Sequence, residues 1–157
     1  MTLDDLTVDF SHLNRETLLS DWQWLTGANR LPVMITVAGD AFIQDSETGA
    51  VHFLDTVEGL LSEVAADGAA FSEFLGDRDF VMQHFAVSLV APLLRAGSKP
   101  PSGKLLSFKQ PPVLGGEYSP ANLEEADIEV HFSLLGQIWL QVSQLPEGTP
   151  ISSIQIR

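Results

Sequence analysis

Apolar side chains near the N-terminus recur at the spacing of one face of a helix. This stripe predicts a helix over residues 15–27, with Asn14 as its N-cap and Gly27 near its end. The members of the stripe are Leu18, Leu19, Trp22 and Leu25. Residues 1–12 precede this pattern, and we expect them to form a loosely ordered N-terminal segment.

Short blocks of β-branched and alternating apolar residues follow, and turn-favouring residues bound each block. These turns are Gly39-Asp40, residues 45–49 and residues 55–59. Because the blocks are joined by loops of hairpin length, they predict an antiparallel β-meander of about four short strands. We place the strands at residues 33–37, 41–44, 50–54 and 60–65.

The apolar spacing returns to a helical period after the meander. A short helix is predicted over residues 67–76. Asp77 is a candidate N-cap for a second helix that runs to Leu93, and Pro92 should kink or end that helix. A loop rich in Gly, Pro and Ser follows at residues 96–104.

One segment near the C-terminus has a pattern that fits either a strand or a helix. Residues 127–144, which follow a short predicted strand at 105–108 and a turn-rich stretch, begin with alternating apolar residues. Their apolar positions also continue at helical spacing for about four turns, which is longer than a usual strand. We therefore favour a helix, ended by Pro146 and Gly148.

The predicted elements together indicate an α+β fold, with one domain over residues 1–157. Its antiparallel sheet should contain about four to six strands, and helices should flank it.

The charge balance is strongly acidic. The 157 residues include 21 Asp and Glu against 8 Lys and Arg, for a formal net charge of -13. Nucleic acids and anionic membranes are bound through basic residues, so both are excluded as direct partners. A basic protein partner is compatible with this charge. The acidic excess is concentrated in residues 1–95, which hold 15 acidic and 4 basic residues.

The residues that are absent also restrict the protein class. The chain has no cysteine, which excludes disulfides, thiol nucleophiles and Cys-ligated metals. The acidic N-terminus does not resemble a secretory signal, and no apolar run reaches the ~20 residues of a membrane span. We therefore expect a cytoplasmic protein, and its oligomeric state stays open.

No motif indicates catalysis or a cofactor. Residues 97–105 superficially resemble a phosphate-binding loop. However, five residues rather than four lie between Gly97 and the Gly103-Lys104 pair, and no Ser or Thr follows that pair. The four histidines are far apart, and we expect structural roles for them, with His52 on an exposed sheet face. The sequence thus predicts no catalytic, metal-binding or cofactor-binding residue, and a protein that is not an enzyme.

Six residues are candidates for contacting a protein partner. Four of them are carboxylates on neighbouring turns of the meander: Asp45, Glu47, Asp55 and Glu58. Trp24 falls off the apolar stripe of its predicted helix, so it is either an exposed anchor or is buried against residues 1–12. Tyr118 is the sixth candidate, and Phe10 is a further possible anchor, because aromatic residues dominate binding energy at interfaces.

Two stretches resemble bacterial immunity domains. Residues 42–75 contain a hairpin with Gly-x-Val-x-x-Leu-Asp, then a strand and a short helix that ends in Phe-x-x-Phe-Leu. Residues 108–151 contain Phe-Lys-x-Pro-Pro-Val-Leu-Gly-Gly, Leu-Gly-Gln-Ile and Leu-Pro-x-Gly-Thr-Pro-Ile. The second set resembles the C-terminal domain of type VI secretion immunity proteins that neutralise a DNase effector, in which a GAD-like domain often precedes this module. The layout is also similar to that of the broader SUKH-type immunity superfamily.

This resemblance implies a non-enzymatic immunity protein that binds and neutralises a toxin domain. It also implies an α+β domain with an antiparallel sheet and flanking helices. We expect the toxin to be nuclease-like and basic. The alternative hypothesis is a small-molecule or regulatory binding module, with a ligand pocket near Gly115-Gly116 and an anion held by Lys99, Lys104 or Lys109.

Overall fold

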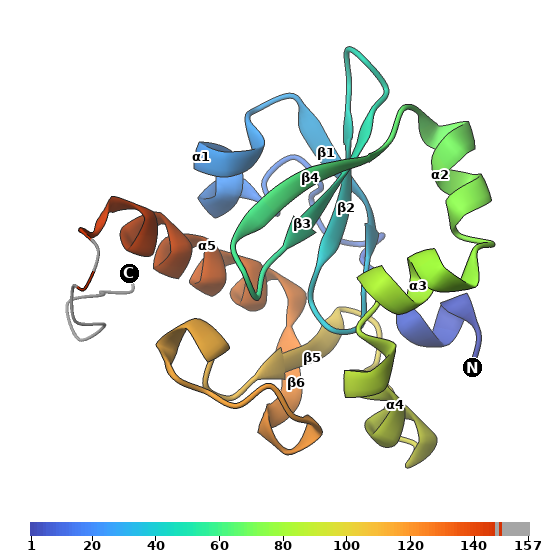
Figure 1. The fold of residues 1–157 in the computed structure, drawn as a ribbon, viewed down its shortest axis with the longest axis vertical. Coiled ribbons are helices and arrows are strands. Elements are labelled where there is room, and N and C mark those ends of the chain that lie inside the picture. The colour runs from blue at the N-terminus through green and yellow to red at the C-terminus, as the bar shows by residue number, and fades with distance from the viewer. Residues whose placement is uncertain (147, 149–157) are drawn as a thin grey trace.

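Four antiparallel strands form the central sheet, in the spatial order β1-β2-β3-β4 (Figure 1). The computed structural model describes residues 1–146 and 148. The strands are β1 (Arg30–Ile35), β2 (Ala41–Asp45), β3 (Val51–Asp55) and β4 (Leu60–Ala65). The predicted meander is therefore confirmed, with each strand within a few residues of its expected place.

β2 and β3 have buried side chains on both faces of the sheet, and successive side chains of each strand point to opposite faces. Phe42 and Phe53 pack on one side with α2 (Gly68–Phe74), α3 (Arg78–His84) and α4 (Val87–Arg95). Ile43 and Leu54 pack on the other side, against α5 (Ile128–Gln144) and the segment around Trp22. Figure 1 shows these two groups of helices on opposite sides of the sheet. The predicted α+β fold is confirmed.

A second, two-stranded sheet lies beside the chain that follows β1. It pairs β5 (Lys104–Phe108) with β6 (Leu123–Asp127), and the Leu106 N–H donates to the Val37 carbonyl at 2.8 Å. Short 3-10 helices η3 (Pro112–Leu114) and η4 (Pro120–Asn122) lie between the two strands in sequence. β6 is absent from the sequence-based prediction, because Leu-Glu-Glu-Ala-Asp has little strand character of its own and depends on pairing with β5.

The N-terminal segment is more ordered than the sequence suggests. Leu3–Leu6 forms a 3-10 helix, η1, and Leu6 is buried in the core. The Val37 N–H donates to the Leu6 carbonyl at 2.8 Å, and Thr7 forms a β-bridge with Thr36. Residues 3–8 therefore depart from the loosely ordered segment that the sequence predicts over residues 1–12, since residues 6–8 pair with residues 35–37.

The prediction of one continuous helix over residues 15–27 is wrong. Residues 15–19 form turns, and only η2 (Ser20–Trp22) and α1 (Gln23–Thr26) are helical. The hydroxyls of Thr17 and Ser20 donate to nearby backbone carbonyls, and such bonds compete with regular helix formation. The apolar stripe still has its predicted role, because Leu18, Leu19 and Trp22 are buried.

The second predicted helix breaks at Ala86 rather than at Pro92. Ala86 has a left-handed backbone with φ 50°, and it separates α3 from α4. Phe85, just before it, is fully buried, and this burial offsets the roughly 1–2 kcal/mol cost of the left-handed conformation. Pro92 lies inside α4.

The C-terminal segment is a helix, as the longer apolar stripe predicts. α5 begins at Ile128, directly after β6, and is the longest helix of the described residues. The expected stop signals at Pro146 and Gly148 lie just beyond Gln144.

Gly136 is the point where α5 comes closest to η2. A Cβ at this position would lie 2.6 Å from the Asp21 carbonyl oxygen, which is well inside van der Waals contact. Nearby, the indole Nε1 of Trp22 donates to the Phe132 carbonyl at 2.8 Å. The absence of a side chain at residue 136 therefore allows the helix to pack at this distance.

We predict that Gly136→Ala lowers the free energy of unfolding by about 1–3 kcal/mol, because the new methyl group would push α5 away from η2. Alanine favours helix formation by about 1 kcal/mol over glycine, so a loss would have to come from the packing clash. Urea denaturation monitored by tryptophan fluorescence measures the effect.

Gly68→Ala is the matched control for this prediction. Gly68 also lies in a helix, but a Cβ there would meet nothing closer than the Gln44 side chain at 3.5 Å. This variant should be as stable as the unmodified protein or slightly more so. Equal destabilisation by both substitutions would contradict the packing argument.

Candidate functional site

The antiparallel meander places its consecutive turns at opposite ends of the sheet. The β2–β3 turn carries Asp45 and Glu47, and the β3–β4 turn carries Asp55 and Glu58. Figure 1 shows the β3–β4 turn at the end that faces α5 and the β2–β3 turn at the opposite end. The four candidate carboxylates therefore do not form one cluster.

The first group of candidates consists of Trp24, Asp45 and Glu47, and we call it the Trp24 end. Asp45 Oδ1 accepts the backbone N–H groups of Glu47 and Thr48 at 2.8 and 2.9 Å. These bonds, together with Arg30 at 3.4 Å, hold the pKa of Asp45 below its usual range. The Ser46 N–H donates to the Asn29 carbonyl at 2.8 Å, which ties this turn to the loop that follows α1.

Trp24 itself is partly exposed. Its ring stacks on Trp22 with a centroid distance of 6.0 Å, and 37% of the residue is accessible to solvent. Of the two alternatives from the sequence, the exposed position is therefore closer to what the structure has.

The second group consists of Asp55, Glu58 and Tyr118, and we call it the Tyr118 end. Asp55 Oδ1 accepts the N–H groups of Val57 and Glu58 at 2.9 and 3.0 Å, which shapes the β3–β4 turn. Tyr118 packs on Phe108 with a ring distance of 5.6 Å and is 58% exposed. Partial burial raises the pKa of Tyr118, and the negative charges of Asp40 and Asp55 add to the rise.

A buried polar cluster lies beneath the Tyr118 end, centred on His131. The Nε2–H of His131 donates to the Gly39 carbonyl at 2.8 Å, since a carbonyl can only accept. Nδ1 then accepts from the Ser107 hydroxyl at 2.7 Å. Burial lowers the pKa of His131 to about 4, so the imidazole is neutral near pH 7. Its structural role agrees with the sequence-based expectation.

Thr56 and Asp40 complete this cluster. The Thr56 hydroxyl lies 2.8 Å from the Gly39 carbonyl, and Asp40 Oδ1 accepts the Thr56 N–H at 2.9 Å. Burial raises the pKa of Asp40 to about 7, and the charge of Asp55 contributes to this rise. Trp139 donates its indole N–H to the Thr56 carbonyl at 3.0 Å. These contacts join two turns, β5 and α5, and no sequence motif marked them.

The cavity beside this cluster is too small for a substrate. It measures about 10 Å³, which is the space for about one water molecule. Ser107 and His131 form a Ser–His pair there, but the second ring nitrogen contacts a backbone carbonyl rather than a carboxylate. The arrangement therefore holds the fold together and lacks the third group of a catalytic triad.

The basic residues of the alternative anion site do not converge. Lys104 pairs with Asp127 at 2.6 Å, and the Lys99 ammonium donates to the Asp4 carbonyl. Neither these lysines nor Lys109 lines the small cavity. Gly116 is packed so closely against the Gln110 carbonyl that a side chain at residue 116 would clash with it. This contact explains the glycine at that position.

His52 corrects one further expectation. The sequence predicts an exposed sheet face for it, but its side chain is only 12% exposed, and Nδ1 is buried without a hydrogen-bond partner. The side chain lies on the face of β3 that also carries Leu54, which α5 covers. Within residues 1–146 and 148, no three His, Asp or Glu side chains come close enough to bind a metal.

None of the helices in residues 1–146 combines the length and the apolar composition that crossing a bilayer requires.

Comparison with known proteins supports the resemblance found in the sequence. Residues 65–139, just under half of the chain, match the family model described as T6SS immunity protein Tdi1, C-terminal. The predicted relation to type VI secretion immunity proteins is thus confirmed over this segment. Such proteins are typically non-enzymatic, in agreement with the sequence-based prediction. No curated protein matches the chain.

The fold also resembles a solved structure. The crystal structure of Atu4351 from Agrobacterium tumefaciens matches with a TM-score of 0.60 and 15% sequence identity. The match covers 79% of this chain and 64% of that protein, so this chain spans less than two thirds of its length. At this identity the likeness concerns the fold alone.

We predict that Asp40→Asn stabilises the protein at pH 8, by up to about 4 kcal/mol. The raised pKa of Asp40, about 7 against 3.8, means that its stabilising contribution is present below pH 3.8 and is lost as pH rises through 7. Asparagine keeps the acceptor oxygen for Thr56 and removes the buried charge. The advantage over the unmodified protein should shrink as pH falls from 7 toward 4.

His131 has the opposite dependence. Its lowered pKa, about 4 against 6.5, means that its contribution is present above pH 6.5 and is lost as pH falls through 4. In the Asp40→Asn variant, where the opposing effect of Asp40 is removed, stability should therefore fall as the pH falls from 6.5 toward 4. Urea midpoints measured from pH 4.5 to 8 test this. Asp45→Asn, at an exposed turn, is the control and should bring no gain at pH 8. An equal gain from both substitutions would contradict the assignment to buried charge.

Proposed function

We propose that this chain is an immunity protein that binds a type VI secretion effector and neutralises it without catalysis. The observation that carries the proposal is the match of residues 65–139 to the T6SS immunity protein Tdi1 C-terminal model. The second ring nitrogen of His131 contacts the Gly39 carbonyl rather than a carboxylate, which favours a binding role over catalysis. We further propose that residues 1–157 act as one domain in this role.

We infer that the target is a basic, nuclease-like domain. A nuclease must present cationic groups to hold phosphates, and an acidic protein can cover those groups. The chain has a net charge of -13, and several of its few basic side chains are engaged within the fold. Arg30 pairs with Asp45, and Lys104 pairs with Asp127. Each of these pairs engages one acidic as well as one basic side chain, so the acidic excess of the chain is unchanged by them.

Neutralisation by coverage requires only stable binding at or near the nucleic-acid groove. Long-range attraction would speed the encounter, and a smaller apolar or aromatic contact would slow dissociation. Because the target would act on nucleic acid inside the cell, we place the immunity protein in the cytoplasm.

We predict that co-expression of this chain protects cells from the effector encoded beside its gene. The purified chain should also suppress the DNase or RNase activity of the toxic domain of that effector at equimolar concentration. If charge steers the encounter, raising NaCl from 50 to 300 mM should slow association by about tenfold or more while changing dissociation less. Stopped-flow or surface plasmon resonance measurements give both rates.

If the effector binds the chain but has no nuclease activity, the proposed immunity function would stand and the proposed nuclease target would be rejected. An association rate that does not change with salt would reject the basic partner. The absence of both binding and protection would reject the proposed function.

A further inference from the structure

We propose that the effector binds at the Tyr118 end, through a basic side chain seated against the Tyr118 ring and the carboxylates of Asp55 and Glu58. This inference rests on the proposed function and adds the surface and the chemistry of the contact. The partner's segment would carry an arginine or a lysine, with an apolar neighbour against Val57 and Pro111.

Tyr118 is presented in a fixed position. Its ring packs on Phe108, which belongs to β5. Asn122 donates to the carbonyls of Gln110 and Glu117 at 2.8 Å each, which closes the loop that carries the tyrosine. A preorganised aromatic side chain loses little entropy on binding, and a cation over its face gains electrostatic energy. Tyr118 therefore has the properties of an interface anchor.

Apolar surface adjoins this ring. Phe108, on which Tyr118 rests, lines the small cavity together with Val57 and Pro111. These residues come from the β3–β4 turn, from the end of β5 and from the segment that follows it, so the cavity marks where these segments meet. An apolar contact beside a charged one is the usual composition of a binding hot spot.

Carboxyl groups adjoin the ring. Asp55 belongs to the adjoining turn, Glu58 is exposed on that turn, and Asp40 lies buried below. Partial burial is the main cause of the raised pKa of Tyr118, and the charges of Asp40 and Asp55 add to it. A cationic partner is therefore attracted to this end.

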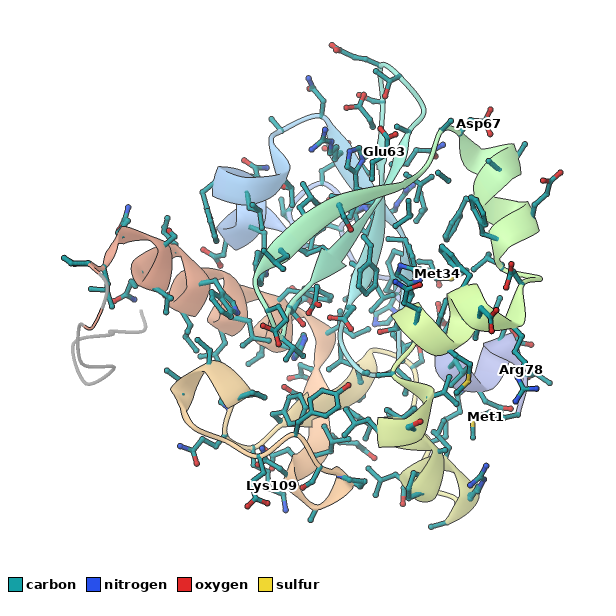
Figure 2. The ribbon with its side chains drawn as sticks, viewed as in Figure 1. Met1, Met34, Glu63, Asp67, Arg78 and Lys109 are labelled. Atoms are coloured by element: carbon teal, nitrogen blue, oxygen red, sulfur yellow. The ribbon has the colours of Figure 1, made fainter. Side chains whose placement is uncertain are left out.

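The other candidate surfaces fit a basic partner less well. At the Trp24 end, Asp45 is already paired with Arg30, and Trp24 leans on Trp22. An open groove of about 340 Å³ between η1 and α3 is lined by Met1 and Arg78, which lie close together in Figure 2. The neighbouring hollow at Met1 is lined by Arg95 and Lys99 together with Asp5, so charges of both signs occur in this region.

The experiment measures the dissociation constant for a catalytically inactive form of the effector encoded beside this chain's gene. Tyr118→Ala should raise Kd by about 10- to 100-fold. The double variant Asp55→Asn, Glu58→Gln should raise it by about tenfold and weaken its salt dependence. Asp55→Asn keeps the oxygen that accepts the turn N–H groups, so the fold should survive, and urea midpoints verify this.

The Trp24 end supplies matched controls. Glu47→Gln removes a turn carboxylate at the opposite end of the sheet, and Trp24→Ala removes an exposed aromatic ring. Both should leave Kd within about twofold. Larger losses from these two variants than from the Tyr118-end variants would overturn the proposed surface and leave the immunity function standing. If the unmodified chain does not bind the effector, the proposed function falls, and this inference falls with it.

Discussion

The backbone carbonyl of Gly39 is the acceptor on which the packing beneath the Tyr118 end depends. It receives the Nε2–H of His131 and lies 2.8 Å from the Thr56 hydroxyl, in a region without bulk water. Gly39 has φ 94°, and a Cβ there would lie 2.3 Å from His131 Nε2. The β1–β2 turn, the β3–β4 turn and α5 therefore meet at an atom that only glycine leaves accessible. Ser107 adds β5 to the same network through His131.

The sequence predicts the parts of this fold that are encoded locally. Alternating residues and turn signals are sufficient for the meander, and the long apolar stripe is sufficient for α5. What the sequence does not predict depends on contacts between distant residues. β6 exists because it pairs with β5, and Ala86 takes a left-handed conformation because Phe85 is buried in the core. A pattern within one segment cannot report such requirements.

The candidate site shows the same difference between what a local sequence pattern predicts and what depends on contacts between distant residues. The turn carboxylates and the two aromatic residues could be selected from composition and position, but their grouping could not. Antiparallel geometry separates Asp45 from Asp55. Packing on Phe108 brings Tyr118 toward the β3–β4 turn, although Tyr118 lies 63 positions after Asp55 in the sequence. Asp40 is visible in the sequence only as a turn residue, although burial gives it the most raised pKa among the described carboxyls. Long-range packing thus decides which candidates can act together.

The matched segment divides the Tyr118 end. Tyr118 and His131 lie within residues 65–139, whereas Asp55 and Glu58 lie before that segment, in the meander. The family-like part thus supplies the rigid aromatic support, and the remaining part supplies the adjoining charges. Substitution of Glu58, which is exposed on the β3–β4 turn, can alter the charges without disturbing the core of the family-like part.

The alternation of turns has a consequence for how this protein can diverge. A strand of five residues spans about 17 Å, so the two ends of the sheet share no side-chain contacts. Effects of substitutions at such separations are usually additive. Each end can therefore accumulate changes independently, and homologous chains can keep one surface constant while the other adapts to a new neighbour.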